Sequence, residues 1–371
     1  MKRRGALFLL LCAPALAGEL PPECRGERDY SSACLDAAWG SAMKVRRAPG
    51  EAAAAPPAKV GAAVKTVDLT ALIPGAAAEP NKGAVGACHA FAAAAMLNAA
   101  YLRQYGESVE FSPADILLQG TAILNPSRLN ERLGGDTGTP MMDTYYWEGG
   151  WITLDFNIAL EHGVAKAEHV PYNEFLPWYT HTLRPATNED MAALDRSGAL
   201  TRILNLSQLS KKDLARAAIR RAGAAEMDEN RKRYEKFLAG REPQAENDRR
   251  ESAARFQGFA PRVLFSDYAP PSGAPDAEEC RAAGAKRSAI IVKELDAGRP
   301  AAVAIDNAAA DFGHEIVIDG YAVDERGALV FKTLNSWGPG KNYAIPEEQM
   351  CHVSEVTALY VPRDGAPPPL F

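Results

Sequence analysis

Residues that could together carry out nucleophilic catalysis are widely separated in this chain of 371 residues. Cys88 stands just before an apolar run, Ala90 to Leu102, that predicts a helix. Unpaired N–H groups and the partial positive charge at a helix N-terminus stabilise a thiolate. A cysteine placed there is therefore suited to act as a nucleophile. The alternative is a small buried core residue, which describes most free cysteines.

A histidine and an asparagine lie far downstream, in two stretches that each predict a strand. Phe312–Tyr321 contains His314, and Val330–Gly338 contains Asn335. The turn sequence Asp324–Gly327 between them predicts an antiparallel hairpin. With a register centred on that turn, the two side chains are offset by two residues and share one face. Such diagonal neighbours lie about 7–8 Å apart at the backbone, so the hairpin predicts a base and a group that orients it.

Cysteine, histidine and asparagine in this order and in these local sequences resemble the papain-like cysteine peptidases. Gly86–Phe91 resembles that family's nucleophile segment, and Gly313–Tyr321 resembles its histidine strand. Asn335–Gly338 is identical to its asparagine segment, and His89 is similar to the bacterial branch. The resemblance extends from about Val67 to Val361. It implies an α+β papain-like fold with a helical left lobe, an antiparallel β-rich right lobe and an active-site cleft between them.

The resemblance also implies a role for each catalytic residue. Cys88 is expected to be the nucleophile, and His314 the general base that later acts as general acid. Asn335 is expected to hold the imidazole in its working orientation. Trp337 is expected to shield the hydrogen bond between His314 and Asn335 from water, although a tryptophan near a strand end is often core packing.

The oxyanion donor departs from the family's pattern. Lys82, preceded by Asn81, stands where the family has a glutamine. The Cys88 backbone N–H can still serve, and either the Asn81 amide or the Lys82 ammonium is left to supply the second hydrogen bond. Loss of one such donor lowers the rate by about 10²–10³. His89 stands where other branches have tryptophan, and we interpret it as a packing residue.

Substrate contacts implied by the resemblance involve glycines. Gly149 and Gly150 would let an extended peptide pair with the enzyme backbone, although a glycine pair more often marks an ordinary turn. Gly313 and Glu315 flank His314 near the position of the family's main side-chain pocket. The carboxyl group of Glu315 hints at basic substrate residues.

The N-terminus has the charged, apolar and small-residue regions of a signal peptide over residues 1–17. Its apolar run is too short to span a bilayer, so export to a periplasm or to the outside is expected. Loss of Cys12 with this peptide would leave an odd number of cysteines. Cys88 would then be the unpaired one. The expected disulfides are Cys24–Cys34 and Cys280–Cys351.

Composition divides the rest of the chain. Residues 18–65 predict a short N-terminal segment and an Ala/Pro-rich linker, and 66–366 a peptidase domain followed by a tail at 367–371. A charged helical insertion is expected at about 177–273, as a surface element or else as a lid or docking arm. A hydrophobic content of 47% and a net charge of −6 are typical of a soluble globular protein and do not favour nucleic-acid binding.

The function predicted from these motifs is peptide-bond hydrolysis through an acyl-enzyme, by an endopeptidase or an exopeptidase acting on a peptide or protein. No His-Glu-x-x-His or Cys-x-x-Cys spacing occurs, so no metal and no cofactor is expected. A monomer is expected. Two alternatives stay open: a non-catalytic papain-like protein that binds a peptide or partner, and an amidase or transpeptidase that uses the same Cys–His pair.

Overall fold

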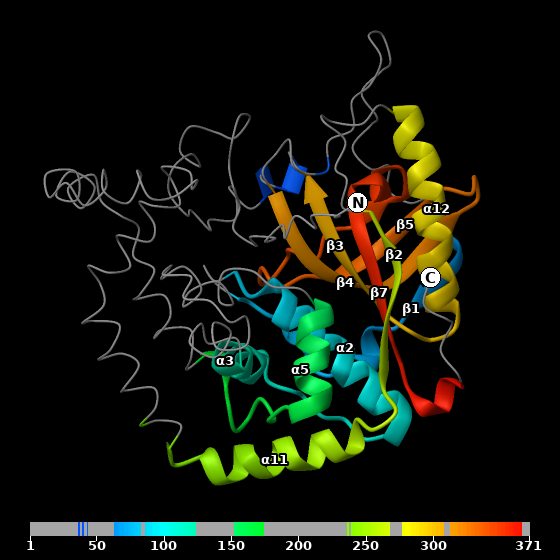
Figure 1. The fold of residues 1–371 in the computed structure, drawn as a ribbon. Helices are drawn as coiled ribbons and strands as arrows, with labels where there is room; N and C mark the ends of the chain where they lie inside the picture. The colour runs from blue at the N-terminus through cyan, green and yellow to red at the C-terminus, as the bar shows by residue number, and fades with distance from the viewer. Residues whose placement is uncertain are drawn as a thin grey trace, which may run out of the picture.

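Helices pack on both faces of an antiparallel sheet in this computed structural model, which confirms the predicted mixed α+β class (Figure 1). It describes residues 36–37, 39–40, 43, 63–82, 86–123, 152–173, 236, 239–267, 277–307 and 312–365. The signal peptide, Cys24, Cys34, Gly149, Gly150, most of the expected insertion and the tail lie outside these residues. Within the described ranges, no helix is long and apolar enough to cross a membrane.

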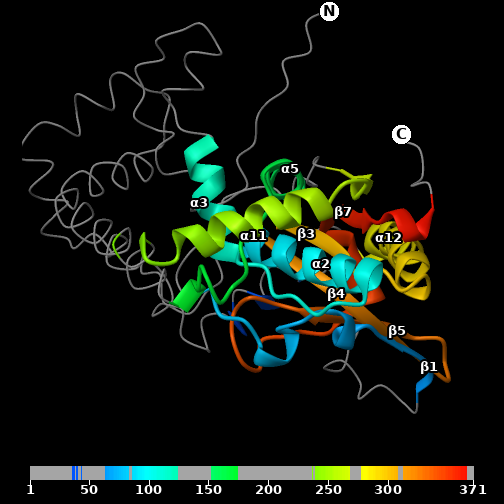
Figure 2. The same ribbon diagram turned by 90° about the horizontal axis from the view of Figure 1, so that it is seen from below.

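Helix α2 is the centre of the helical side. It begins at Cys88, and Gly106 ends it in the left-handed conformation, with φ 73°. Alanines make up much of its length and are buried, because small side chains let neighbouring elements approach closely. Both views place α2 between the sheet and the other helices (Figure 2). The helices of this side are α2 (Cys88–Tyr105), α3 (Pro113–Ile123), α5 (Ile152–His162) and α11 (Glu242–Arg255).

A capped helix start and an ion pair hold this side together. The Ser112 hydroxyl accepts a hydrogen bond from the Asp115 N–H at 3.0 Å, as its capping sequence predicts. The buried Asp115 carboxylate in turn pairs with Arg249 of α11 at 2.7 Å. Because Arg249 is itself largely buried, this pair attaches the charged helix α11 to the body.

The sheet has the strand order β2-β7-β3-β4-β5-β6, with β1 paired to β4, and every pairing is antiparallel. Helix α12 (Ala277–Asp296) packs against the outer face of this sheet, and the 3-10 helix η6 (Glu347–His352) lies beside it. The strands are β1 (Ala63–Asp68), β2 (Ala260–Ser266), β3 (Ala301–Asn307), β4 (Phe312–Asp324), β5 (Leu329–Leu334), β6 (Ile345–Pro346) and β7 (Val353–Tyr360).

Strands β4 and β5 form the predicted hairpin. Gly327, with φ 81°, closes the turn by donating its N–H to the Asp324 carbonyl at 2.9 Å. The register shifts once, between Ile318 and Gly320, so one extra residue is accommodated in β4. Beyond the shift, Val317 pairs with Leu334, which places Asn335 just past the open end of the hairpin.

Alternation along β4 separates two cores. Val317 faces the helical side and belongs to the core built around α2, whereas Ile316 and Ile318 face the outer side with α12. Every second side chain along a strand points to the same face, so His314 lies on the face of Ile316, and Glu315 lies on the face of Val317. The histidine and the residue after it therefore lie on opposite faces of the sheet.

The last part of the region in which a helical insertion is expected contains a strand. Residues 260–266 form β2, an edge strand paired with β7. The cause is the aromatic pair Phe256 and Phe259, whose rings lie 6.4 Å from Tyr101 and 6.3 Å from Tyr105 of α2, respectively. These contacts return the chain to the body directly after α11, which is itself helical as the charge pattern predicts. The expected helix at 210–240 lies almost entirely outside the described residues.

Candidate active site

The side chain of Cys88 is completely buried at the first position of α2. A small cavity of about 20 Å³ lies beside it, lined also by Asn335 and Ser336 of the segment after β5 and by Glu315 of β4. The packing of α2 on β4 thus brings the helix N-terminus to the open end of the hairpin.

The sulfur of Cys88 is in a disulfide in this structure. Cys280 and Cys351 are bonded to each other, as the sequence predicts, so the partner of Cys88 lies outside the described residues. The prediction that Cys88 is the unpaired cysteine is therefore wrong for this oxidised chain. That prediction counted the cysteines after removal of Cys12, which leaves an odd number. The whole chain has six cysteines, an even number. None of the described cysteines is free.

The imidazole of His314 and the amide of Asn335 meet at the open end of the hairpin. His314 Nε2 lies 2.8 Å from Asn335 Oδ1. Asn335 Nδ2 donates to the Lys341 carbonyl at 2.9 Å, which fixes the amide with its oxygen toward the histidine. Because that oxygen only accepts, Nε2 carries the hydrogen, and Nδ1 is the nitrogen that can take a proton.

Trp337 covers this hydrogen bond. Its indole stacks on the His314 ring, with centroids 4.4 Å apart and an interplanar angle of 18°. Both rings are buried, so water has little access to the imidazole from this side. The geometry is that expected of a shield, and the aromatic ring is at the same time part of the outer core.

The imidazole is held in its neutral form. Burial is the main cause that lowers the pKa of His314, to about 3, and the nearby Lys82 ammonium lowers it further. The hydrogen bond with Asn335 acts in the opposite direction but is outweighed. The imidazole is therefore unprotonated at neutral pH and has a nitrogen free to take a proton, although a pKa this far below neutrality makes it a weaker base than an ordinary histidine.

Lys82 and Asn81 lie across from the segment after β5. The Lys82 N–H donates to the Ser336 carbonyl at 2.8 Å, and Asn81 forms a β-bridge with Trp337. Gly338 adopts φ 89°, and a Cβ there would lie 3.0 Å from the Asn81 amide nitrogen. Glycine at position 338 therefore permits both the turn and the close approach of Asn81. The Lys82 side chain is buried.

A row of acidic residues lies behind the histidine, on the helical side of the sheet. Glu315 of β4 and Glu355 of β7 both pair with Ala304 of β3 and are buried. Burial, together with the charges of Asp155 and Glu355, raises the pKa of Glu315 well above its usual range, against a hydrogen bond from the backbone of Ile152. Sequence reasoning missed Asp155 and Glu355, which carry no local motif.

His89 pairs with Asp155 in this interior. Its Nδ1 lies 2.7 Å from the Asp155 carboxylate, and both side chains are completely buried. The residue is thus a buried hydrogen-bonded group that joins α2 to α5. Of the glycines expected to contact substrate, only Gly313 is described, and it pairs with Asp306 of β3.

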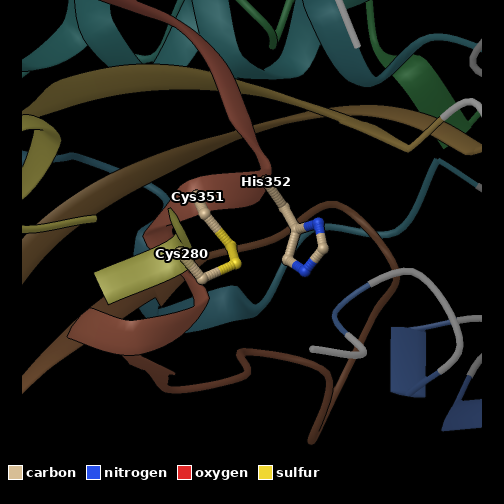
Figure 3. A group of neighbouring side chains, drawn as sticks. All are labelled: Cys280, Cys351 and His352. Carbon is tan, nitrogen blue, oxygen red and sulfur yellow. A yellow bond between two sulfur atoms is a disulfide. The ribbon is translucent and has the colours of Figure 1, made fainter. Parts of the chain in front are cut away.

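Cys280, Cys351 and His352 form the one cluster of metal-ligating side chains in the described part of the chain, with ligand atoms within 4.8 Å of one another. Figure 3 shows the two sulfurs joined to each other beside the imidazole. A disulfide has no thiolate to offer a metal ion. In this oxidised form the cluster is a covalent link between α12 and η6.

Comparisons with known proteins find structural likeness alone. No protein-family model matches the chain, and no curated protein matches it. A recombinant stem bromelain precursor is similar at 15% identity and a TM-score of 0.39, over 81% of this chain and 70% of that one. Bromelain from Ananas comosus in complex with the E64 inhibitor is similar at 15% identity and a TM-score of 0.38, over 80% and 97%.

A digestive procathepsin L 3 from the larval midgut of Tenebrio molitor is similar at 11% identity and a TM-score of 0.39, over 87% of this chain and 78% of that one. All three TM-scores lie below 0.5.

Proposed function

We propose that this protein is an exported papain-like cysteine peptidase in which Cys88, His314 and Asn335 carry the reaction. The observation that supports this most directly is the buried His314–Asn335 hydrogen bond under the Trp337 ring, together with the small cavity that Asn335 lines with Cys88 at the start of α2. An oriented imidazole and a cysteine at a helix N-terminus are the two groups that thiol catalysis needs. A disulfide between Cys280 and Cys351 suits an oxidising compartment.

The reaction begins with proton transfer from the Cys88 thiol to Nδ1 of His314. The thiolate attacks the peptide carbonyl, and a C–S bond forms as the carbonyl π bond opens to an oxyanion. Collapse of this intermediate breaks the C–N bond while the imidazolium gives its proton to the leaving amine. Water, deprotonated by the same histidine, then hydrolyses the thioester and restores the thiol.

Lys82 is our preferred second oxyanion donor, beside the Cys88 backbone N–H. Its ammonium lowers the pKa of His314, so its charge lies within electrostatic range of that imidazole. The Asn81 amide instead packs against Gly338. A buried positive charge stabilises a developing oxyanion more strongly than a neutral amide does.

Activity requires reduction of the Cys88 disulfide, because a sulfur bonded to another sulfur is not a thiolate. A dithiol gives two electrons and two protons to this bond, which releases Cys88 and its partner as thiols and leaves the reductant as a cyclic disulfide. The same disulfide is the one observation that favours the non-catalytic alternative, in which Cys88 is structural.

Labelling with a thiol-directed peptidyl inhibitor separates the two functions. After treatment with dithiothreitol, we expect one inhibitor adduct per chain on Cys88, together with hydrolysis of a peptide library. Both are expected to be lost in Cys88→Ala and in protein kept oxidised. Iodoacetamide serves as the control that shows Cys88 to be reduced and accessible. A chain whose Cys88 reacts with iodoacetamide but that neither takes up the inhibitor nor cleaves any peptide is not a peptidase.

A further inference from the structure

A short N-terminal segment contacts the catalytic hairpin from outside the expected peptidase domain. We name it the N-terminal anchor. Two of its side chains, Trp39 and Met43, are buried in the outer core of the sheet. Its described residues are Asp36, Ala37, Trp39, Gly40 and Met43.

A polar path runs from the anchor to the catalytic histidine. Asp36 accepts hydrogen bonds from the Lys341 ammonium and the Tyr343 hydroxyl, each at 2.6 Å. Lys341 is buried, and its carbonyl accepts the 2.9 Å hydrogen bond that orients the Asn335 amide. Asn335 then meets His314 at 2.8 Å. The backbone carbonyl that positions Asn335 thus belongs to a residue whose side chain the anchor holds.

An aromatic path runs parallel to the polar one. Trp39 stacks on Tyr343, with centroids 4.6 Å apart and planes 17° apart, and meets Trp337 edge to face at 6.1 Å. Trp337 stacks on His314. Trp39 therefore packs against the ring that covers the catalytic hydrogen bond.

The segment between these two paths is irregular. Residues 338–344 lie outside the strands, and both Gly338 and Gly340 adopt positive φ, at 89° and 75°. A segment with few ladder hydrogen bonds depends on its side-chain contacts for its geometry. The contacts of Lys341 and Tyr343 with the anchor are such contacts.

We propose that Asp36 and Trp39 are positioning residues for the His314–Asn335 pair, and that the active enzyme keeps its N-terminal anchor. The proposal rests on the proposed peptidase function. The anchor acts through Asn335 and Trp337 and does not touch the substrate. Its removal would expose Trp337 and release Lys341, so the anchor differs from a segment that must leave for the enzyme to work.

The Cys88 disulfide fits this arrangement. Its partner lies outside the described residues, and the cysteines found there, Cys12, Cys24 and Cys34, all precede Asp36 in the sequence. Reduction frees the thiol without breaking the contacts of Trp39, so activation does not require loss of the segment.

Variants of the full-length, dithiothreitol-reduced protein test the proposal. We expect Trp39→Ala to lower kcat about twofold to tenfold, the range of a lost aromatic contact, with KM nearly unchanged. We expect the acid limb of the kcat/KM profile to move to higher pH, because a better hydrated His314 has a higher pKa. Trp39→Phe should retain both values, and Asp36→Asn should retain more activity than Asp36→Ala. Val64→Ala, at an exposed strand position, is the matched control.

Titration of His314 by NMR provides a readout that does not need activity. The proposal is wrong if Trp39→Ala has the same His314 pKa as the parent and, where the parent is active, the same kcat. If the parent itself has no activity but Trp39→Ala shifts the His314 titration, the positioning role holds and the peptidase function fails.

A cleavable linker covers the case in which Trp39→Ala does not fold. A site for a specific protease is placed at residues 51–57, and the reduced protein is cut and passed over a sizing column. We expect activity to fall when the N-terminal fragment separates and to return when that fragment is added back. Full activity after its separation would overturn the proposal.

Discussion

The imidazole of His314 stacks on the indole of Trp337, with ring centroids 4.4 Å apart and planes 18° apart. This contact places the His314–Asn335 hydrogen bond in a dry environment, where a hydrogen bond is electrostatically stronger than in water. It also contributes to the burial that keeps His314 neutral. One aromatic ring therefore acts on both the orientation and the protonation state of the proposed base.

Substitution of Trp337 should change the pH dependence of activity. In Trp337→Ala, water reaches His314, its pKa rises, and the acid limb of kcat/KM moves to higher pH. The variant should also lose about 3–5 kcal/mol of unfolding free energy, as is usual for a buried tryptophan. Trp337→Phe keeps a stacking ring and should keep the acid limb. Steady-state kinetics from pH 3 to 9 measure the shift, and an unmoved limb in Trp337→Ala would contradict a shielding role.

Substitution of Lys82 should change both the pKa of His314 and kcat. Lys82→Met removes an ammonium that lowers the pKa of His314, so the acid limb should move to higher pH. If Lys82 is also the oxyanion donor, kcat should fall by about 10²–10³. Lys82→Gln keeps a hydrogen-bond donor and should recover part of kcat without restoring the acid limb. Asn81→Ala is the control: a larger loss of kcat there would make Asn81 the donor instead.

Acid should destabilise the fold through His314. Its pKa is about 3 in the folded state, below the ordinary 6.5. The unfolded chain therefore takes up a proton below pH 6.5 that the folded chain does not take up until near pH 3. The stability from the neutral imidazole is present above pH 6.5 and falls by up to about 1.4 kcal/mol per pH unit on acidification. Denaturant unfolding at pH 7 and pH 5 should show a smaller loss in His314→Gln than in the parent.

Loss of the Cys280–Cys351 disulfide should lower stability more than activity. The bond closes a loop with a sequence separation of 71, for which the chain-entropy relation gives about 4 kcal/mol. It ties α12 to η6, and neither of these elements carries a proposed catalytic residue. The double variant Cys280→Ser/Cys351→Ser should therefore unfold at lower denaturant concentration but keep its kcat. A large loss of kcat at a temperature where the variant is folded would show that this link also shapes the site.

Local sequence was sufficient for the elements that carry the proposed site. The apolar run after Cys88 predicts a helix, and the helix begins at Cys88. The turn between two β-rich stretches predicts a hairpin, and the hairpin brings His314 and Asn335 together. Helical periodicity, capping and tight turns depend on residues a few positions apart, so a sequence contains them directly.

The remaining features depend on residues that meet only after the chain folds. The pairing of β2 with β7, the Cys88 disulfide and the contacts of Trp39 with the hairpin all join distant segments. The neutral state of His314 also depends on the folded structure, because burial and the Lys82 charge act on the imidazole through space. The sequence by itself thus determined which residues are available for chemistry and on which elements they lie. Only the tertiary structure decided how they are paired, shielded and charged, because free energies of burial and electrostatic interaction depend on distance in three dimensions.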